Sequence, residues 1–332
     1  MKNCILPAFL CFFISLSARA QDFQSKHFTV QKLANGVWAL IHINGGYAIC
    51  NAGIIDLGDG VLVFDPFLSP EPAQEIKKAA LALTGHPIKW VVNSHFHNDH
   101  IGGNQVFENV QIISTERTRE LIAKFQPEEI ASDKKEIPGE LKKLRNKNTT
   151  KMSAHELAEH TMDLGYNEAL DRVDDTLRVV LPDLTFSNHF IIHGATRNVE
   201  LISYGEGHTE SDAFLWLPNE KIAFLGDLLF IQNQPWIGDG NMDHWTNYLD
   251  SIGRLGPKKL IPGHGPVGTI ADIDGMKAYF ASVRNRATDY FKKGIEPRSD
   301  STLTSPAPFG EWMLSSFYRP NVNTEYKRMS KK

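Results

Sequence analysis

The residues with the clearest potential for chemistry lie close together in segment 93–103, which reads NSHFHNDHIGG. Four ligand-type side chains fall within six residues of it, namely His95, His97, Asp99 and His100. The segment follows an apolar run that predicts a strand, and residues two apart on a strand point the same way. Such a dense group of imidazoles and carboxylates suits zinc, and iron or manganese would also be accepted. We therefore expect a metal site at the end of this strand.

Three further metal-ligand candidates lie where other apolar runs meet glycine-flanked turns. They are His208 in the triplet GHT, Asp227 in LGD and His264 in GHG. Turns at strand ends commonly carry functional side chains. Each of these turns is ordinary when taken alone, so the prediction depends on the whole ordered set.

Together, these motifs resemble the metallo-β-lactamase superfamily of metallohydrolases. The matching order is H-x-H-x-D-H, then G-H-T, G-D and G-H-G, over roughly residues 28–270. The resemblance implies an α/β fold, a four-layer αββα sandwich with the site at one edge of its two sheets. It is specific for the fold and the metal, and much less so for the substrate.

Carried over residue by residue, the resemblance implies a site for two zinc ions per chain. The first ion would be held by His95, His97 and His208, the second by Asp99, His100 and His264, and Asp227 would bridge both. Two such ions, about 3.5–4 Å apart, share a water and make hydroxide available near neutral pH. Asp99 is the candidate catalytic residue that orients this water and carries its proton. Asp65 resembles the family's acid that accepts a hydrogen bond from a ligand histidine.

Departures from the family pattern bear on the substrate. β-Lactamases with two zinc ions usually have Cys or Ser where Asp227 stands, and many lack His100. This chain has both residues, as in the thioesterases and lactonases of the family, although Phe230 stands where quorum-signal lactonases commonly have Tyr. We predict a hydrolase of a small carbonyl substrate: an ester, a lactone, a thioester or an amide/lactam. A true β-lactamase and an iron-dependent oxidoreductase with the same ligands stay open as alternatives.

The elements that must position these residues follow from periodicity and turn signals. Strands are predicted at 28–31, 37–43, 48–55, 60–64, 88–93, 110–113, 190–193, 199–204, 213–217 and 222–225, and helices at 71–83, 115–125, 245–255 and 276–291. This order indicates two β-layers covered by helices, which agrees with the sandwich.

Two regions lie outside that pattern. The stretch at about 126–175 is charged, poor in β-branched residues and contains a capping box at 153–156, so we predict a helical insertion that serves as a lid or a homodimer surface. Residues 297–332 are rich in Ser, Thr and Pro and are expected to form a loosely packed tail. The metallohydrolase domain itself would span 21–296.

Two other segments give weaker signals. The loop Trp236–Asn241 lies between Asp227 and His264 in the sequence, where it would either line the mouth of the pocket or simply pack. His155 and His160 resemble a zinc-protease helix, but they are five residues apart and fall on different helix faces, so a solvated helix is favoured.

The first twenty residues have the layout of a secretory signal peptide. One lysine precedes the apolar stretch 4–16, and the small residues of Ser17–Ala20 predict cleavage after Ala20. The apolar stretch is too short to span a bilayer comfortably. We expect a periplasmic or secreted protein without stable membrane association after cleavage, and without an internal disulfide because only Cys50 remains.

The charge balance excludes some partners. The chain of 332 residues has 35 Lys and Arg against 39 Asp and Glu, and loss of Lys2 and Arg19 with the signal changes the balance to 33 − 39 = −6. A protein of this charge has no electrostatic reason to bind nucleic acid. The expected partner is therefore a small-molecule substrate.

Overall fold

The structure is a computed structural model that describes residues 23–173 and 176–331. The predicted signal peptide lies outside these residues. Within them, no helix is both long enough and apolar enough to cross a membrane.

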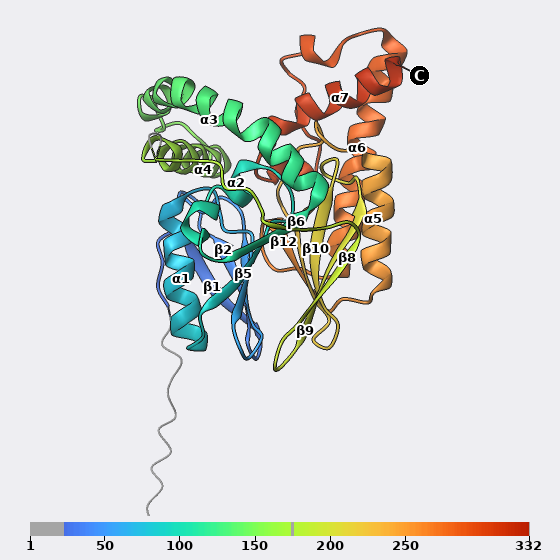
Figure 1. Ribbon diagram of the computed structural model, residues 1–332. Coiled ribbons are helices and arrows are strands. Elements are labelled where there is room, and N and C mark those ends of the chain that lie inside the picture. The colour runs from blue at the N-terminus through green and yellow to red at the C-terminus, as the bar shows by residue number, and fades with distance from the viewer. Residues whose placement is uncertain (1–22, 174–175, 332) are drawn as a thin grey trace, which may run out of the picture.

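Two β-sheets form the centre of the molecule (Figure 1). The seven-stranded sheet consists, in spatial order, of β1 (Phe28–Ala34), β2 (Val37–His42), β3 (Ala52–Asp56), β4 (Val61–Phe64), β5 (Ile88–Val92), β6 (Gln111–Thr115) and β7 (Leu184–Phe186). The five-stranded sheet has the order β12 (Lys259–His264), β11 (Ile222–Phe230), β10 (Asp212–Leu217), β9 (Asn198–Gly205) and β8 (His189–His193). Strands β1 to β4 form the antiparallel meander that the turn residues favour.

The two sheets pack face to face through a shared apolar core. Phe64 of β4 meets Phe224 of β11 with ring centroids 6.0 Å apart, and both are buried. Ile55, Leu215 and Ile261 belong to the same core, so alternate residues of both sheets point inward. The free energy of burying this apolar surface holds the two halves of the site together.

Helices cover the outer face of each sheet (Figure 1). On the seven-stranded sheet, α1 (Pro70–Thr84) buries Ile76 and Ala80. On the five-stranded sheet, α5 (Met242–Arg254) and α6 (Ile270–Lys293) bury Trp245 and Phe280, whose ring centroids are 4.9 Å apart. The predicted four-layer αββα sandwich is confirmed.

The helical region after β6 differs from the prediction in its first boundary. A single helix, α3 (Glu116–Arg145), contains both the helix predicted at 115–125 and the first part of the predicted insertion. It passes through Pro127 and Pro138 without ending. After a turn, α4 (Ala154–Asp171) begins with the predicted capping box, in which Ser153 and Glu156 bond each other's backbone N–H groups.

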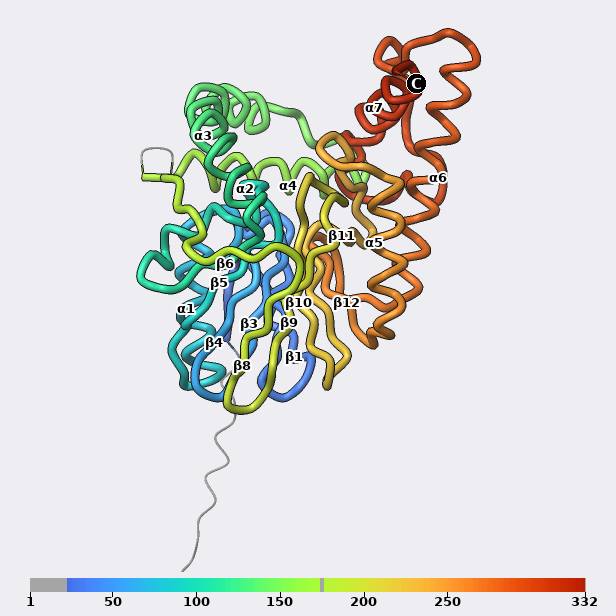
Figure 2. The backbone as a smooth tube through the Cα atoms, turned by 45° about the vertical axis from the view of Figure 1, so that its right-hand side comes forward, coloured from blue at the N-terminus to red at the C-terminus, as the bar shows by residue number. Residues whose placement is uncertain are grey.

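The C-terminal region is packed, so the expectation of a loose tail is wrong. Residues 318–330 form α7 (Tyr318–Ser330), which lies against α6 and buries Tyr318 and Val322 in the same core as α5. These apolar side chains at helical spacing outweigh the polar composition around them. Figure 2 shows α3 and α4 (green) and α7 (red) beyond the same end of the two sheets.

Candidate metal centre

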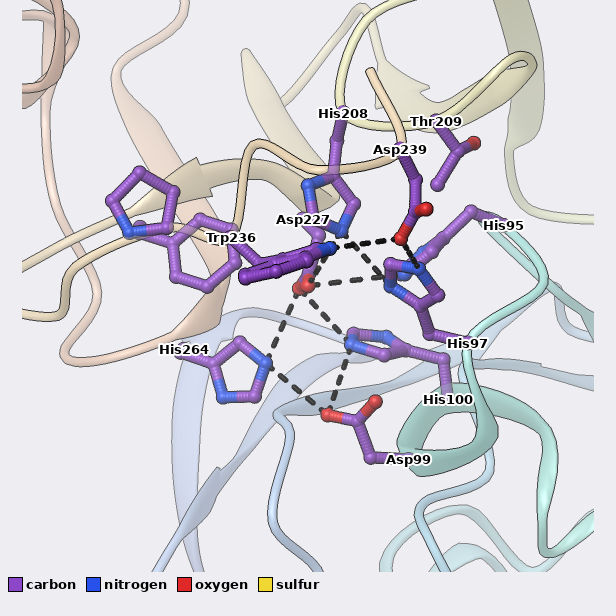
Figure 3. A network of polar contacts seen from close by, with 12 residues as sticks. His95, His97, Asp99, His100, His208, Thr209, Asp227, Trp236, Asp239 and His264 are labelled. Atoms are coloured by element: carbon purple, nitrogen blue, oxygen red, sulfur yellow. Dashed lines mark hydrogen bonds and ion pairs between the residues drawn. The ribbon is translucent and has the colours of Figure 1, made fainter. Parts of the chain in front are cut away.

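All seven predicted ligand residues converge at this end of the sheets (Figure 3). His95 and His97 follow β5, whereas Asp99 and His100 lie on the one-turn helix α2 (Asn98–Ile101). From the other sheet come His208 in the loop after β9, Asp227 within β11 and His264 at the end of β12. The strand predicted to end at residue 225 continues to Phe230, so Asp227 is held on a strand rather than in a turn.

Close backbone approaches at glycines make this convergence possible. A Cβ atom on Gly102 would lie 1.7 Å from the carbonyl oxygen of Leu68, so α2 fits only because this residue has no side chain. Gly226 has a φ of +50°, and a Cβ there would lie 2.5 Å from Ser94 Oγ. Gly102 thus lets α2 approach the segment after β4, and Gly226, which precedes Asp227, lets β11 approach the segment after β5 in the other sheet.

The ligand atoms form two groups that share one carboxylate. The potential ligand atoms of His95, His97, His208 and Asp227 all lie within 4.8 Å of one another, as do those of Asp99, His100 and His264. Asp227 Oδ2 is 3.3 Å from His208 Nε2, while its Oδ1 is 3.0 Å from His100 Nε2 and 3.4 Å from His264 Nε2. One oxygen of Asp227 therefore faces each group.

Several of these atoms are buried without a hydrogen-bond partner. They include His95 Nε2, His100 Nε2 and Asp227 Oδ1, the last two of which approach each other at 3.0 Å without hydrogen-bond geometry. Buried polar atoms are almost always paired, because leaving one unpaired costs about 1–3 kcal/mol. Imidazole nitrogens and carboxylate oxygens are ligands for divalent transition metals. The residues therefore fit a pair of bound cations.

Hydrogen bonds behind the centre fix the histidine tautomers. Asp65 Oδ2 accepts a bond from His100 Nδ1 at 2.8 Å, which is the contact expected for this acid, and another from the Ser94 hydroxyl at 2.7 Å. Because the Ser94 hydroxyl donates to Asp65, its oxygen can accept from His95 Nδ1 at 2.9 Å. These bonds imply that both histidines present the lone pair of Nε2 to the site. Sequence reasoning missed the role of Ser94.

Asp65 is held in an uncommon conformation to do this. Its φ is +52°, in the left-handed region that a non-glycine residue seldom adopts. The Ser94 backbone N–H donates to Asp65 Oδ1 at 2.8 Å, so both carboxylate oxygens are engaged. Backbone strain of this kind persists where the surrounding structure determines the geometry, as at functional sites.

The electrostatics of the centre favour cations. Burial lowers the pKa of His95 well below its usual value, so its ring is neutral and able to act as a ligand. Burial alone would raise the pKa of Asp227, but His100 and His264 hold it well below its usual range. The pKa of His264 rises to about 9, because Asp227 and Asp99 outweigh the opposing effect of burial. Metal ions compete with protons for such ligands.

A second carboxylate touches the centre from the opposite side. Asp239 Oδ2 lies 3.2 Å from His97 Nε2 and accepts a bond from the Trp236 indole N–H at 2.9 Å (Figure 3). His97 Nδ1 thereby faces His208 Nε2, 3.0 Å away. Two roles were left open for this loop, lining the mouth of the pocket or simply packing. Trp236 and Asp239 do line the cavity, but the contact with His97 was not foreseen.

The C-terminal helix holds this loop in place. The Asn321 side chain accepts a bond from the Ile237 backbone N–H at 3.1 Å and donates to the Pro235 carbonyl at 2.6 Å. The Arg328 guanidinium donates to the Ile237 carbonyl at 3.2 Å and also to that of Gly240. Residues of α7 thus fix the backbone on both sides of Trp236 and Asp239.

The centre opens into a cavity of about 480 Å³. Besides the metal centre, its wall includes Glu129 of α3, Met162, Asp163 and Tyr166 of α4, and Leu314, Ser316 and Phe317 before α7. Tyr166 OH accepts a bond from the Asn98 side chain at 3.0 Å, which ties α4 to α2. The insertion therefore forms one wall of the cavity. His155 and His160 do not line it.

Comparisons with known proteins agree with this geometry. The family model described as "Metallo-beta-lactamase superfamily" matches residues 45–264. The chain belongs to the metallo-β-lactamase superfamily. Most members of this superfamily are metal-dependent hydrolases, and the ligand candidates from His95 to His264 fall within the matched range.

Individual relatives of this superfamily member are distant. It is 26% identical over 244 residues to "Beta-lactamase-like protein 2 homolog" of Caenorhabditis elegans, a match that covers 72% of this chain and 64% of that protein. It is 22% identical over 258 residues to "Metallo-beta-lactamase type 2" of Pseudomonas aeruginosa, which covers 76% and 82%. Less than two thirds of the nematode protein is therefore represented in the match.

Solved structures share the metallo-β-lactamase fold. A metallo-β-lactamase from Pontibacter korlensis superposes with a TM-score of 0.57 at 18% identity, over 77% of this chain and 99% of that one. The DIM-1 metallo-β-lactamase gives 0.54 at 16% identity, over 76% and 96%. The superfamily match ends at His264, so α6 and α7 lie beyond it.

Proposed function

We propose that the protein is an exported dinuclear zinc hydrolase that cleaves a small carbonyl substrate, namely an ester, a lactone, a thioester or an amide/lactam. The position of Asp227 carries this proposal. Its two oxygens face two separate groups of ligands, at 3.3 Å from His208 Nε2 and 3.0 Å from His100 Nε2. A carboxylate that is buried between two such groups is best accounted for by two bound cations.

The chemistry then depends on how the chain prepares a water for attack. When bound, two zinc ions would lower the pKa of a shared water toward neutrality and polarise the substrate carbonyl. Asp99 lines the cavity, and its Oδ2 lies 3.2 Å from His264 Nε2 and 3.5 Å from His100 Nε2. The surrounding histidines offset the effect of burial and lower its pKa. An ionised carboxylate there can accept the proton that the attacking water loses.

The metal content of the purified protein, measured together with a panel of esters, lactones, thioesters and β-lactams, tests this proposal. We expect two equivalents of zinc per chain and turnover of at least one carbonyl class. A single tightly bound iron without hydrolysis would instead support the oxidoreductase alternative. Fast turnover of a chromogenic cephalosporin would support a true β-lactamase.

The signal-like sequence of residues 1–20 supports export. N-terminal sequencing of protein recovered outside the cytoplasm should begin at Gln21, since the small residues before it favour cleavage there. An intact Met1 on the exported protein would contradict this part of the proposal. Neither the net charge nor the cavity gives a reason to expect nucleic acid as a partner.

A further inference from the structure

The cavity carries negative charge beyond what the metal centre requires. Glu129 from α3 and Asp163 from α4 line it in addition to Asp99, Asp227 and Asp239. All of the lining residues belong to the described part of the chain, and none of them is Lys or Arg. A substrate carboxylate in this cavity would therefore find no cationic side chain to pair with.

Glu129 lines the cavity, where it would face a ligand that binds there. Its Oε2 accepts a bond from the Gln126 side chain at 2.6 Å, and Gln126 also contacts the Phe96 carbonyl at 3.4 Å, beside His97. Glu129 is only partly exposed, and its hydrogen-bond donor among the described residues is the neutral side-chain amide of Gln126. Its single anchor is neutral, so its charge is uncompensated by the protein.

Aromatic rings complete the wall around these acids. Tyr166, Phe230, Trp236 and Phe317 line the same cavity, and the rings of Trp236 and Phe317 meet edge to face with centroids 5.6 Å apart. The faces of aromatic rings attract ammonium groups, and the attraction grows where water is excluded. Carboxylates and aromatic rings together are a suitable environment for an organic cation.

We propose that this wall binds a cationic group of the substrate, an ammonium above all, while the scissile carbonyl lies at the metal centre. This rests on the proposed function and names its substrate class. The two ends of the cavity then have opposite tasks, since bound cations at one end attract the carbonyl oxygen and the acids of α3 and α4 attract the ammonium. A carboxylate beside Glu129 would be desolvated without a partner, which is costly. β-Lactam antibiotics, which carry such a carboxylate, should be poor substrates.

Three 4-nitrophenyl esters of similar length test the proposal: the neutral pentanoate, the cationic 4-(trimethylammonio)butanoate and the anionic glutarate. With the purified metal-loaded protein we expect kcat/KM to fall in the order cationic, neutral, anionic. Glu129→Gln should reduce the ratio of cationic to neutral turnover about 5- to 10-fold, as loss of one partly buried charge pair would. Glu129→Lys should reverse the order for the charged pair.

A matched control lies one residue away. Glu128 is exposed on the same helix and does not line the cavity, so Glu128→Gln should leave all three rates and their ratio unchanged. Asp163→Asn provides a second test on α4, should the α3 variant fold poorly, and it should shift the ratio in the same direction.

Direct binding separates this inference from the proposed hydrolysis. Calorimetric titration of the wild-type protein should show tighter binding of phenyltrimethylammonium than of benzenesulfonate, and Glu129→Gln should weaken the former several-fold. If the neutral ester is hydrolysed but charge does not affect rate or binding, the inference is wrong and the hydrolase stands. If no carbonyl substrate is hydrolysed while phenyltrimethylammonium binding depends on Glu129, the proposed function fails but the cation site stands.

Discussion

Two carboxylates on different walls of the cavity, Asp239 on the Trp236–Gly240 loop and Glu129 on α3, differ in how the protein holds them. Asp239 contacts His97 at 3.2 Å, accepts the Trp236 N–H and lies on a loop whose backbone is bonded to α7. Glu129 has a single neutral anchor, Gln126. A carboxylate tied to a ligand histidine orients that ligand, whereas one left without a counter-charge is available to a substrate. We therefore assign the positioning of His97 to the wall that carries Asp239, and the selection of substrate charge to the wall that carries Glu129.

The largest effect is expected at the candidate metal centre itself, on which all hydrolysis would depend. Asp227→Ala would remove the carboxylate shared by both groups of ligands, so we expect loss of metal from one or both sites and a fall in hydrolysis of roughly a thousandfold or more. Elemental analysis and steady-state kinetics of the variant provide the check. Full metal occupancy with undiminished turnover would refute the assignment of Asp227.

Asp239→Asn tests the positioning wall. Loss of the charge behind His97 should weaken metal affinity or activity about 10- to 100-fold, the effect typical of a carboxylate that orients a ligand histidine. Competition with a chromogenic chelator measures the affinity separately from turnover.

Asp274→Asn, on the exposed side of α6, is the matched control and should behave as wild type. If Asp239→Asn binds metal normally and changes only the preference for substrate charge, then Asp239 and Glu129 both select substrate charge and the proposed difference between them is wrong.

The hydrogen bonds from Asn321 of α7 to the loop that carries Asp239 should have a smaller effect on metal affinity. Asn321 is fully buried and holds the backbone at Pro235 and Ile237, so Asn321→Ala should lower the free energy of unfolding by about 1–3 kcal/mol. Metal affinity should fall only a few-fold, because Asp239 itself is retained. Urea denaturation and the chelator assay measure the two effects. A lower free energy of unfolding with unchanged metal affinity would show that the bonds from Asn321 do not influence the orientation of His97.

The smallest effect expected is a pH dependence of the preference for cationic substrates, which we attribute to Glu129. Burial and the neighbouring Asp133 raise the pKa of Glu129 to about 7, with His97 opposing and Asp99 adding to the shift. Its charge is therefore present above this pH and lost as the pH falls through it. The ratio of cationic to neutral ester turnover should drop several-fold between pH 8 and pH 6.

The same pH series on Glu129→Gln supplies the control, since the drop in the ratio should then be much smaller, with only Asp163 and Asp133, whose pKa values are also raised, left to titrate near this range. Tyr166 also faces this carboxylate, but its burial raises its pKa far above the range tested, so it stays neutral. A wild-type ratio that does not change with pH would argue against an ionised Glu129 in the cavity.

The seven ligand candidates could be found in the sequence because each lies in a local motif. His95 to His100 fall within six residues, and the others stand beside glycines that allow close backbone approach. Strand and helix periodicity, which apolar burial imposes on each element separately, indicated two β-layers covered by helices, and the family resemblance implied the αββα sandwich. Asp65 was predicted only through the resemblance, and its contact with His100 is present.

Features that depend on distant segments could not be predicted in this way. Asp239 meets His97 across 142 positions of sequence, and no local pattern marks that contact. The C-terminal region was misjudged because its polar composition conceals Tyr318 and Val322, which pack only once α6 is in place. The role of Glu129 depends on α3 continuing past residue 126, where the change in composition had indicated a boundary.

The bonds from α7 to the Trp236–Gly240 loop have a consequence for the chain as a whole. If the bonds from α7 favour metal binding through the orientation of His97, then metal binding must favour the packing of α7 by the same free energy, because coupling between two sites acts equally in both directions. Residues of α7, which lie beyond the range matched by the superfamily, would then share in the energetics of metal binding.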